Sequence, residues 1–311
     1  MPPDTWVSFG HISRSRMSST ANVFGSVVTA AVWRRNRLAS SHGRAAGPRA
    51  LMLVCVLLLS IGTRCIADDE SAIAKQAQNP IASMISVPFQ NNLNFGVGPK
   101  DGQQNVLDIQ PVVPFKLTDD WNLITRTIVP VIYEPYISPA AGNATGLGDA
   151  QVALYLSPAT PKDSIIWGIG PAISFPTATE RYLGQGKFSA GLSAVALTIR
   201  GPWLVGLLVT DSTSVAGESD RPDVHQFLAQ PFVNFNFPHG WYLASSPIIT
   251  ANWKAPSDER WTVPLGGGGG KILKIGKQRL NVQVQAFDDV VHAHDAGNWT
   301  LRFQVQLLFP K

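Results

Sequence analysis

A glycine run is the first stretch of this sequence whose residue types and spacing could do chemistry. Gly266–Gly270 is followed by Lys271, as in a loop that cradles phosphate groups. That motif requires a glycine five residues before the Gly-Lys pair and a Ser or Thr after the lysine. Leu265 and Ile272 occupy those places. The run therefore predicts a strand in which missing side chains allow bending or close packing.

Histidines offer two other kinds of chemistry. His292 and His294 share one side of an extended segment beside Asp295, so they could give a metal two imidazoles and a carboxylate. A solvated polar turn is the simpler interpretation of that segment. Hydrolysis would need a serine beside a histidine, yet neither a nucleophile elbow nor a His-Ser lipase motif is visible. We therefore predict no catalytic residue, no metal and no cofactor, so the protein is not expected to be an enzyme.

Polar residues at alternate positions of apolar segments are the third candidate. They are Asp108, Gln110, Arg126, Asp149, Gln151, Gln230, Asn234, Asn236, Asn252, Gln283, Gln285, Arg302 and Gln304. On one reading they line a pore and filter solutes by hydrogen bonding and charge. On the other they fill a closed interior in which Arg126 and Arg302 pair with Asp108 and Asp149. Both readings require strands that turn these residues toward one side.

The last such segment shows the alternation most clearly. Every second residue from Trp299 to Phe309 is apolar, and the residues between them are polar except Leu308. Side chains of a strand alternate between its faces, so one face is bulky and apolar. A soluble sandwich also contains such strands. An amphipathic strand at the extreme C-terminus, however, is typical of a barrel in a bacterial outer membrane.

The chain from about residue 81 predicts twelve strands and no helix. They span 81–97, 103–117, 121–136, 147–157, 164–176, 187–200, 202–215, 223–237, 240–254, 260–275, 278–291 and 298–309. Short turns follow the even-numbered strands, whereas longer polar loops tend to follow the odd-numbered ones. With an even strand count, this pattern is typical of a transmembrane β-barrel. Prolines within several strands predict bulges or loosened pairing.

Aromatic residues near strand ends predict contact with the membrane interfaces. Trp241 and Trp253 lie on one face of the ninth strand, twelve residues apart. At ~3.3 Å per residue and a tilt of ~45°, that strand spans roughly 28 Å, close to the ~25 Å apolar band of such barrels. Trp299 and Phe309 bound the last strand in the same way. We therefore predict these four residues in the two aromatic girdles.

The N-terminal part of the chain has a composition of its own. Eight of the 25 Lys and Arg residues precede residue 68, against one acid, and the remainder carries a net charge of −3. An apolar run at 51–62 follows the arginines and is too short for a transmembrane helix. These features predict an N-terminal extension and signal peptide over 1–67, with cleavage after Ala67. Both cysteines, Cys55 and Cys65, fall in this leader. Nucleic-acid binding loses its support, because the basic residues belong to the leader.

Short motifs along residues 79–311 give the sequence a family resemblance. They include Gln110-Pro111-Val112-Val113-Pro114, Gly146-Leu147-Gly148-Asp149, Trp167-Gly168-Ile169-Gly170-Pro171, Pro176-Thr177-Ala178-Thr179 and Trp261-Thr262-Val263-Pro264-Leu265-Gly266. The chain resembles bacterial outer-membrane "transporter" proteins, many of them misnamed neuromedin U, which are similar to the phenol-degradation meta-pathway barrel family. The resemblance implies an outer-membrane β-barrel that passes small, in some cases aromatic, solutes. It implies no catalytic residue.

These observations together predict the fold, the cellular location and the function of the protein. We expect an all-β, antiparallel up-and-down transmembrane barrel over 81–311, preceded by a short periplasmic segment at 68–80. The expected partners are outer-membrane lipid, a small-molecule solute and the barrel-assembly machinery during insertion. The expected role is passive or facilitated passage of solutes across the bacterial outer membrane. A closed structural or adhesive barrel and a secreted soluble β-sandwich are the alternatives.

Overall fold

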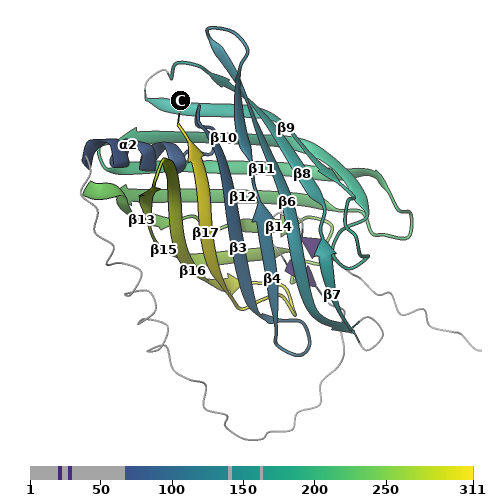
Figure 1. Ribbon diagram of the computed structural model, residues 1–311. Coiled ribbons are helices and arrows are strands. Elements are labelled where there is room, and N and C mark those ends of the chain that lie inside the picture. Colours follow the sequence, from purple (N-terminus) through teal and green to yellow (C-terminus); the bar gives the residue numbers. More distant parts are fainter. Residues whose placement is uncertain (1–19, 23–26, 30–66, 139–141, 162–163, 311) are drawn as a thin grey trace, which may run out of the picture.

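The fold is built almost entirely from strands. The computed structural model describes residues 20–22, 27–29, 67–138, 142–161 and 164–310 (Figure 1). Its elements are β1 (Thr20–Asn22), β2 (Val27–Thr29), α2 (Ala67–Ala77), β3 (Ile85–Val97), β4 (Gly102–Ile109), β5 (Val112–Lys116), β6 (Trp121–Ser138), β7 (Gly142–Leu147), β8 (Ala150–Pro158), β9 (Ile165–Phe175), β10 (Lys187–Arg200), β11 (Trp203–Gly217), β12 (His225–Asn236), η1 (Pro238–Gly240), β13 (Trp241–Ser245), β14 (Ile249–Asn252), β15 (Trp261–Ile275), β16 (Gln278–Val291) and β17 (Trp299–Phe309). No helix among the described residues has both the length and the apolar character to cross a membrane.

A single antiparallel sheet closes on itself to form a barrel. Each strand pairs with its neighbours along the chain, the first strand β3 pairs with the last strand β17, and β11 pairs with β12. β5, β7 and β14 continue the courses of β4, β8 and β13, so the wall has twelve strands. The predicted fold class and strand number are therefore confirmed. β1 and β2 form a separate pair outside this sheet.

The barrel has an inverted distribution of side chains. Outward-facing apolar residues stay exposed, for example Leu192 at 62% and Leu243 at 57%, whereas amides, hydroxyls and the guanidinium of Arg302 are buried inside. A soluble domain buries its apolar residues instead. A polar interior beneath an apolar outer band is the arrangement that a lipid environment requires. This distribution contradicts the soluble β-sandwich.

Prolines interrupt two of the predicted strands. The predicted strand 103–117 is divided at Pro111 into β4 and β5, and the predicted strand 240–254 is divided at Pro247 into β13 and β14. Proline has no N–H to give to the ladder, so pairing lapses there. The prediction of one continuous ninth strand, on which the length estimate relied, is wrong.

The two ends of the barrel differ in their connections. Short turns join β5 to β6, β10 to β11, β12 to β13 and β15 to β16, and we call this the turn end. Long connections such as 176–186 and 218–224 lie at the opposite end, the loop end. Ile85 pairs with Phe309, so the barrel begins and finishes at the turn end. This agrees with the layout predicted from loop lengths.

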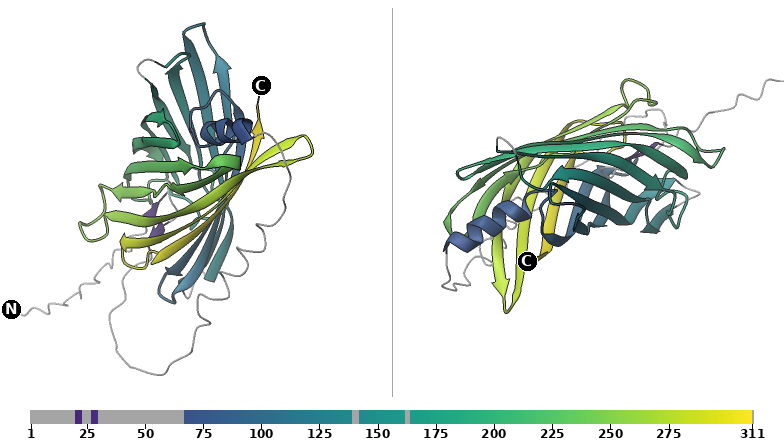
Figure 2. Two further views of the ribbon diagram at one scale, coloured as in Figure 1. Left: turned by 90° about the vertical axis from the view of Figure 1, so that its left-hand side faces the viewer. Right: turned by 90° about the horizontal axis from the view of Figure 1, so that it is seen from above.

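A helix that the sequence analysis did not predict lies at the turn end. α2 contacts η1, β12, β13 and β15, and two further views show it at the same end as the C-terminus (Figures 1 and 2). Its Ile73 and Ala74 pack with Met84, Ile272 and Leu308. Leu308, the one apolar residue on the polar face of the last strand, faces inward to meet this helix.

The N-terminal boundary also differs slightly from the prediction. β3 begins at Ile85, not at residue 81, because the residues before it turn into the barrel and Ile81 is buried there. The predicted signal peptide, its cleavage after Ala67 and the upstream extension lie almost wholly outside the described residues.

Candidate functional site: the barrel interior

Two cavities inside the barrel are enclosed by the described residues. The first, of about 140 Å³, is lined by residues of the loop-side half, including Asp108, Asp149, Asp289 and Arg302. The second, of about 120 Å³, is lined by residues nearer the turn end, including Asn79, Asn281 and Gln306. We call them the loop-side and turn-side cavities. Each is roughly ten times the volume that one water molecule needs.

Ten of the thirteen predicted interior residues line these cavities. Asp108, Asp149, Gln151 and Arg302 line the loop-side cavity, and Asn234, Gln283 and Gln304 line the turn-side cavity. Gln110, Arg126 and Gln230 line both. The period of two in the sequence thus places these side chains on one side of the wall.

The other three predicted residues are buried but line neither cavity. The amide of Asn236 exchanges hydrogen bonds of 2.9 and 3.1 Å with Gln78, just after helix α2. Asn252 Oδ1 accepts a hydrogen bond from the backbone N–H of Lys254 at 3.1 Å. Gln285 Oε1 accepts one from Ser246 Oγ at 2.9 Å. Each of the three amides is therefore held by at least one hydrogen bond.

Side-chain ladders cross the strands on the polar side of the loop-side cavity. Thr300 Oγ1 donates to Asn94 Oδ1 at 2.7 Å, and Asn94 Nδ2 donates to Gln104 Oε1 at 2.6 Å. Gln104 Nε2 then donates to Glu134 Oε2. This chain runs through β17, β3, β4 and β6. Hydrogen-bonded ladders of this kind satisfy buried polar groups without filling the barrel.

A second ladder contains the buried guanidinium of Arg302. Its Nε donates to Asn92 Oδ1 at 2.9 Å, and its Nη1 donates to the carbonyl oxygen of Ser246 at 2.9 Å. Asn92 Nδ2 in turn donates to Asp108 Oδ2 at 3.3 Å. An amide therefore lies between Arg302 and Asp108.

The direct charge pairing expected on the closed-interior reading is not found in the described part of the barrel. Among the described residues, Arg126 and Arg302 form no ion pair within 4 Å with Asp108 or Asp149. Arg126 Nη2 instead donates to Gln110 Oε1 at 2.8 Å. The alternating pattern identified the inward face, but it could not show which neighbours would meet across the strands.

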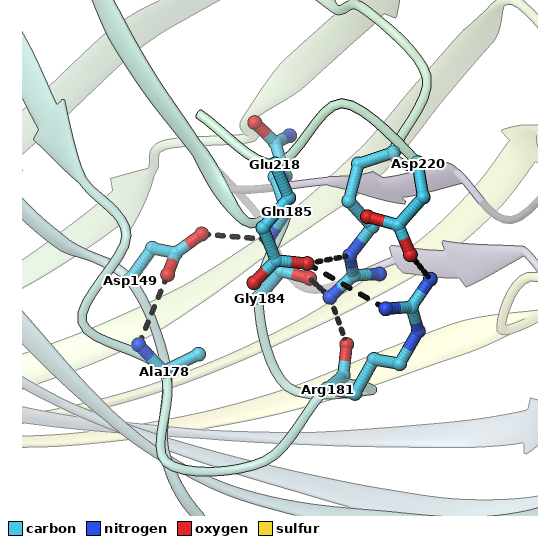
Figure 3. Close-up of polar contacts among 8 residues, drawn as sticks. Asp149, Ala178, Arg181, Gly184, Gln185, Glu218 and Asp220 are labelled. Carbon is cyan, nitrogen blue, oxygen red and sulfur yellow. Dashed lines mark hydrogen bonds and ion pairs between the residues drawn. The ribbon is translucent and has the colours of Figure 1, made fainter. Parts of the chain in front are cut away.

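A loop folds inward at the loop end, and Asp149 holds it. The segment 176–186 between β9 and β10, here called the mouth loop, places Leu183 and Gly184 against the loop-side cavity. The Asp149 carboxylate accepts the backbone N–H of Ala178 at 3.1 Å and that of Gln185 at 2.6 Å (Figure 3). Hydrogen bonds to an ionised carboxylate are among the stronger ones. The two bonds pin both ends of the loop to the wall.

Two of the sequence motifs that carry the family resemblance meet at this loop. The Thr179 hydroxyl accepts the backbone N–H of Leu147 at 3.0 Å, and Thr177 Oγ1 accepts that of Ala150 at 2.8 Å. Thr177 Oγ1 also donates to the carbonyl oxygen of Gly148 at 3.2 Å. The Gly-Leu-Gly-Asp segment and the Pro-Thr-Ala-Thr segment therefore form one structural unit that anchors the mouth loop.

A buried arginine supports the mouth loop from the neighbouring loop. The Arg221 side chain is only 8% exposed, and its Nη2 donates to the carbonyl oxygens of Gly184, at 3.1 Å, and of Arg181. Its Nε lies 3.4 Å from Glu218 Oε2. Arg181 also pairs with Asp220 at 2.8 Å. These contacts join the loops 176–186 and 218–224 over the mouth of the barrel.

Ion pairs set the protonation of two carboxylates in the loop 218–224. The hydrogen bond from Arg181 lowers the pKa of Asp220 below its usual range. The hydrogen bond from Lys187, whose Nζ lies 3.1 Å from Asp223 Oδ1, lowers the pKa of Asp223. Both carboxylates therefore stay ionised to a lower pH than ordinary aspartates.

The turn end is narrowed by the segment before β3. Ile81 lies inside the barrel and packs with Ile124, Tyr155 and Leu204. Asn79 and Pro80 line the turn-side cavity. Gln306 Nε2 donates to the carbonyl oxygen of Ala77 at 3.3 Å, which attaches the end of helix α2 to β17. The chain therefore enters its own barrel before the first strand begins.

The aromatic residues predicted for the girdles lie at strand ends. Trp253 and Trp299, at the loop end, are 38% and 39% exposed, and Phe309, at the turn end, is 42% exposed. Trp299 stacks on Phe95 with ring centroids 4.1 Å apart. At the turn end, the Lys271 ammonium lies 4.7 Å from the Trp241 ring centroid. Their role at the membrane interface stays a prediction.

The glycine run and the histidine segment are the remaining candidates from the sequence. Gly266–Gly270 lies within strand β15, as predicted. His294 Nδ1 lies 3.7 Å from Asp295 Oδ1, and His292 Nδ1 contacts the carbonyl oxygen of Ala293 at 3.0 Å. No group of three or more His, Cys, Asp or Glu side chains suited to a metal occurs among the described residues.

Several interior residues were absent from the sequence prediction. Gln90, Asn92, Asn94 and Gln104 line the loop-side cavity from β3 and β4. Their spacing at alternate positions in β3 could have identified three of them. Asp289 also faces this cavity, near the loop end of β16. It sits beside Asp288 in the sequence, so alternation alone does not show which of the two points inward.

Comparison with known proteins agrees with this architecture. No protein-family model and no curated protein matches the chain. It is similar to an outer membrane channel from Pseudomonas putida F1, with a TM-score of 0.55 and 18% identity over 73% of this chain and 94% of that one. The fold is that of an outer-membrane β-barrel.

Two more distant structures have related shapes. The NanC porin gives a TM-score of 0.48 and 8% identity over 73% of this chain and all (100%) of that one. Outer membrane phospholipase A from Escherichia coli gives a TM-score of 0.39 and 13% identity over 79% of this chain and 99% of that one. These likenesses are too remote to add to the argument.

Proposed function

We propose that this outer-membrane barrel is a channel for the passive or facilitated passage of small solutes. The observation that carries the proposal is the pair of cavities inside the barrel, with residues such as Arg126 and Gln230 lining both. A barrel whose interior were completely filled by its own side chains would have neither. Twelve strands lie between the eight that side chains can fill and the sixteen that leave a wide channel.

The loop-side cavity favours solutes with an apolar body and a polar group. Its polar side comes from β17, β3 and β4, with Asn92, Gln104 and Arg302. Its other side, from β8 to β12, presents apolar residues such as Tyr155 and Leu228. A binding site with a mostly apolar wall and a few hydrogen-bonding groups suits small organic molecules. We therefore propose small aromatic or otherwise hydrophobic compounds as the solutes.

The proposed family follows from the same features. We infer that the chain is related to the outer-membrane transporter proteins that its motifs resemble, because two of those motifs anchor the mouth loop through Asp149 and Thr177. Its proposed partners are outer-membrane lipid, the solute and the barrel-assembly machinery. We propose no catalytic step.

Conductance in planar bilayers tests the proposal. The chain from Asp68 to Lys311, refolded in detergent and inserted into the bilayer, should give discrete and reproducible current steps. A shift in gel migration on heating would show that the barrel is folded. Folded, inserted protein without current would overturn the channel proposal.

The closed barrel stays the second candidate function because of one observation. Ile81 packs inside the turn-side half of the barrel, where it narrows any passage. A closed barrel would act through its external loops, such as 218–224. Folded, inserted protein that carries no current but binds a partner through these loops would favour this candidate.

A further inference from the structure

The two interior cavities share a small set of side chains. Gln90, Gln110, Arg126 and Gln230 line both the loop-side and the turn-side cavity, and we call these four residues the waist. Gln110 follows β4, whereas Gln230 belongs to β12. In the closed strand order, β12 lies six strands from β4 in either direction. The waist therefore includes residues from opposite sides of the barrel, and a solute moving between the cavities must pass it.

Arg126 gives the waist its charge. The other three members are neutral amides, and the Arg126 guanidinium donates one hydrogen bond, to Gln110 Oε1 at 2.8 Å. Among the described residues that line the turn-side cavity, Arg126 is the only charged one. A guanidinium has five N–H donors, so this hydrogen bond leaves further donors for a ligand. Carboxylates match this donor geometry well.

The other charged residues that line a cavity with Arg126 all lie on the loop side of the waist. Asp108 lines the loop-side cavity two residues before Gln110, and its carboxylate accepts a hydrogen bond from Asn92 at 3.3 Å. Arg302 lines the same cavity and is held by Asn92 and Ser246. Asp149 is occupied by the mouth loop. The other described residues that line the turn-side cavity are uncharged, so the positive charge of Arg126 dominates there.

We propose that the waist is the selectivity filter of the channel and that Arg126 makes it prefer small anions, carboxylates above all. This inference rests on the proposed channel function. An anion would exchange part of its hydration for the guanidinium and for the amide N–H groups of Gln90, Gln110 and Gln230. A cation of the same size would meet the positive charge where the two cavities join. Rings of charged side chains select ions in this way.

Ion preference can be measured from the reversal potential in a gradient of potassium chloride. The wild-type protein should favour chloride over potassium. R126Q should lower the chloride-to-potassium permeability ratio at least about fivefold, as expected for losing one unit charge at close range. R126E should reverse the preference. D108N, which removes one of the acids that line the loop-side cavity, should raise the ratio.

A matched control removes a positive charge outside the passage. Arg200 is exposed at the turn end, so R200Q should leave the permeability ratio unchanged.

Sodium acetate on one side of the bilayer provides a carboxylate probe. It should carry current through the wild-type channel and much less through R126Q. Heat-modifiable migration of every variant must match that of the wild type.

Three results would overturn the inference. One is an unchanged permeability ratio in a conducting, folded R126Q protein, and the second is a wild-type preference for potassium. Either would leave the channel proposal intact and remove Arg126 from the filter. The third is the absence of current in every folded variant, which would overturn the channel proposal itself and the filter with it.

Discussion

Asp149 shows how one residue organises the outer mouth. Its carboxylate accepts two backbone N–H groups from a loop that would otherwise have no regular structure to satisfy them. A buried donor that loses its partner costs about 1–3 kcal/mol, and more when the partner is charged. Asp149 therefore contributes strongly to the inward position of the mouth loop, together with Thr177 and Arg221.

Replacing Asp149 should release the mouth loop. In the D149A variant both N–H groups lose their acceptor, so the loop should open more often. Trypsin cleavage after Arg181 should become about tenfold faster or more, since ~1.4 kcal/mol corresponds to a factor of ten. The measurement is the cleavage rate in reconstituted liposomes. D211N is the control, because Asp211 contacts His225 on an exposed part of the wall. Equal cleavage of both variants would contradict the role of Asp149.

Low pH should loosen the same region. The pKa values of Asp220 and Asp223 are lowered by Arg181 and Lys187. A carboxylate whose pKa is lower in the folded protein than in the unfolded chain stabilises the folded loops at pH values above its ordinary pKa of about 3.9. That stabilisation is lost as the pH falls through the lowered pKa values. Loss of these ion pairs should therefore change the channel current as the pH falls below about 4. A D220N/D223N double variant should show the low-pH current already at neutral pH. A double variant that behaves like the wild type would contradict this assignment.

The elements of the barrel could largely be predicted from the sequence, whereas the elements that close it could not. Alternation in β17 and β16 identified the strands and their inward faces, because a period of two is a local property. The inward position of Ile81 could not be predicted, because it depends on the space left by strands far along the chain. Helix α2 left a weak signal, three acids early in the helix followed by Ile73 and Ala74.

The glycine run in β15 should be essential for the close packing of this strand against β16. A Cβ atom on Gly268 would lie 1.9 Å from the carbonyl oxygen of Val284, and one on Gly266 would lie 2.0 Å from that of Ala286. Backbone cannot yield at such distances, so G268V should lower the free energy of unfolding by about 3 kcal/mol or more. Urea unfolding followed by gel migration measures this. L265V, on the exposed outer face of the same strand, is the control. A G268V barrel as stable as L265V would show that β15 and β16 can separate.

At the scale of the whole molecule, the segment before β3 should restrict the current at the turn end. A chain that starts at Ile85 lacks helix α2 and Ile81, so the turn-side half should open and the single-channel current should rise severalfold. A chain that starts at Gln78 lacks only the helix and keeps Ile81 inside the barrel. Its current should stay close to that of the wild type. Equal currents from the two truncated proteins, both shown to be folded, would place the restriction elsewhere.

The pairing of β3 with β17 has a consequence for biogenesis. Ile85 and Phe309 are partners across almost the whole described barrel, so contact order is high and folding is expected to be slow. The ring cannot close until the last eleven residues of the sheet have been synthesised. Until then the chain has two unpaired edges, each able to recruit a strand from another molecule. We therefore expect the unfolded chain to aggregate unless its edges are covered during transit to the membrane.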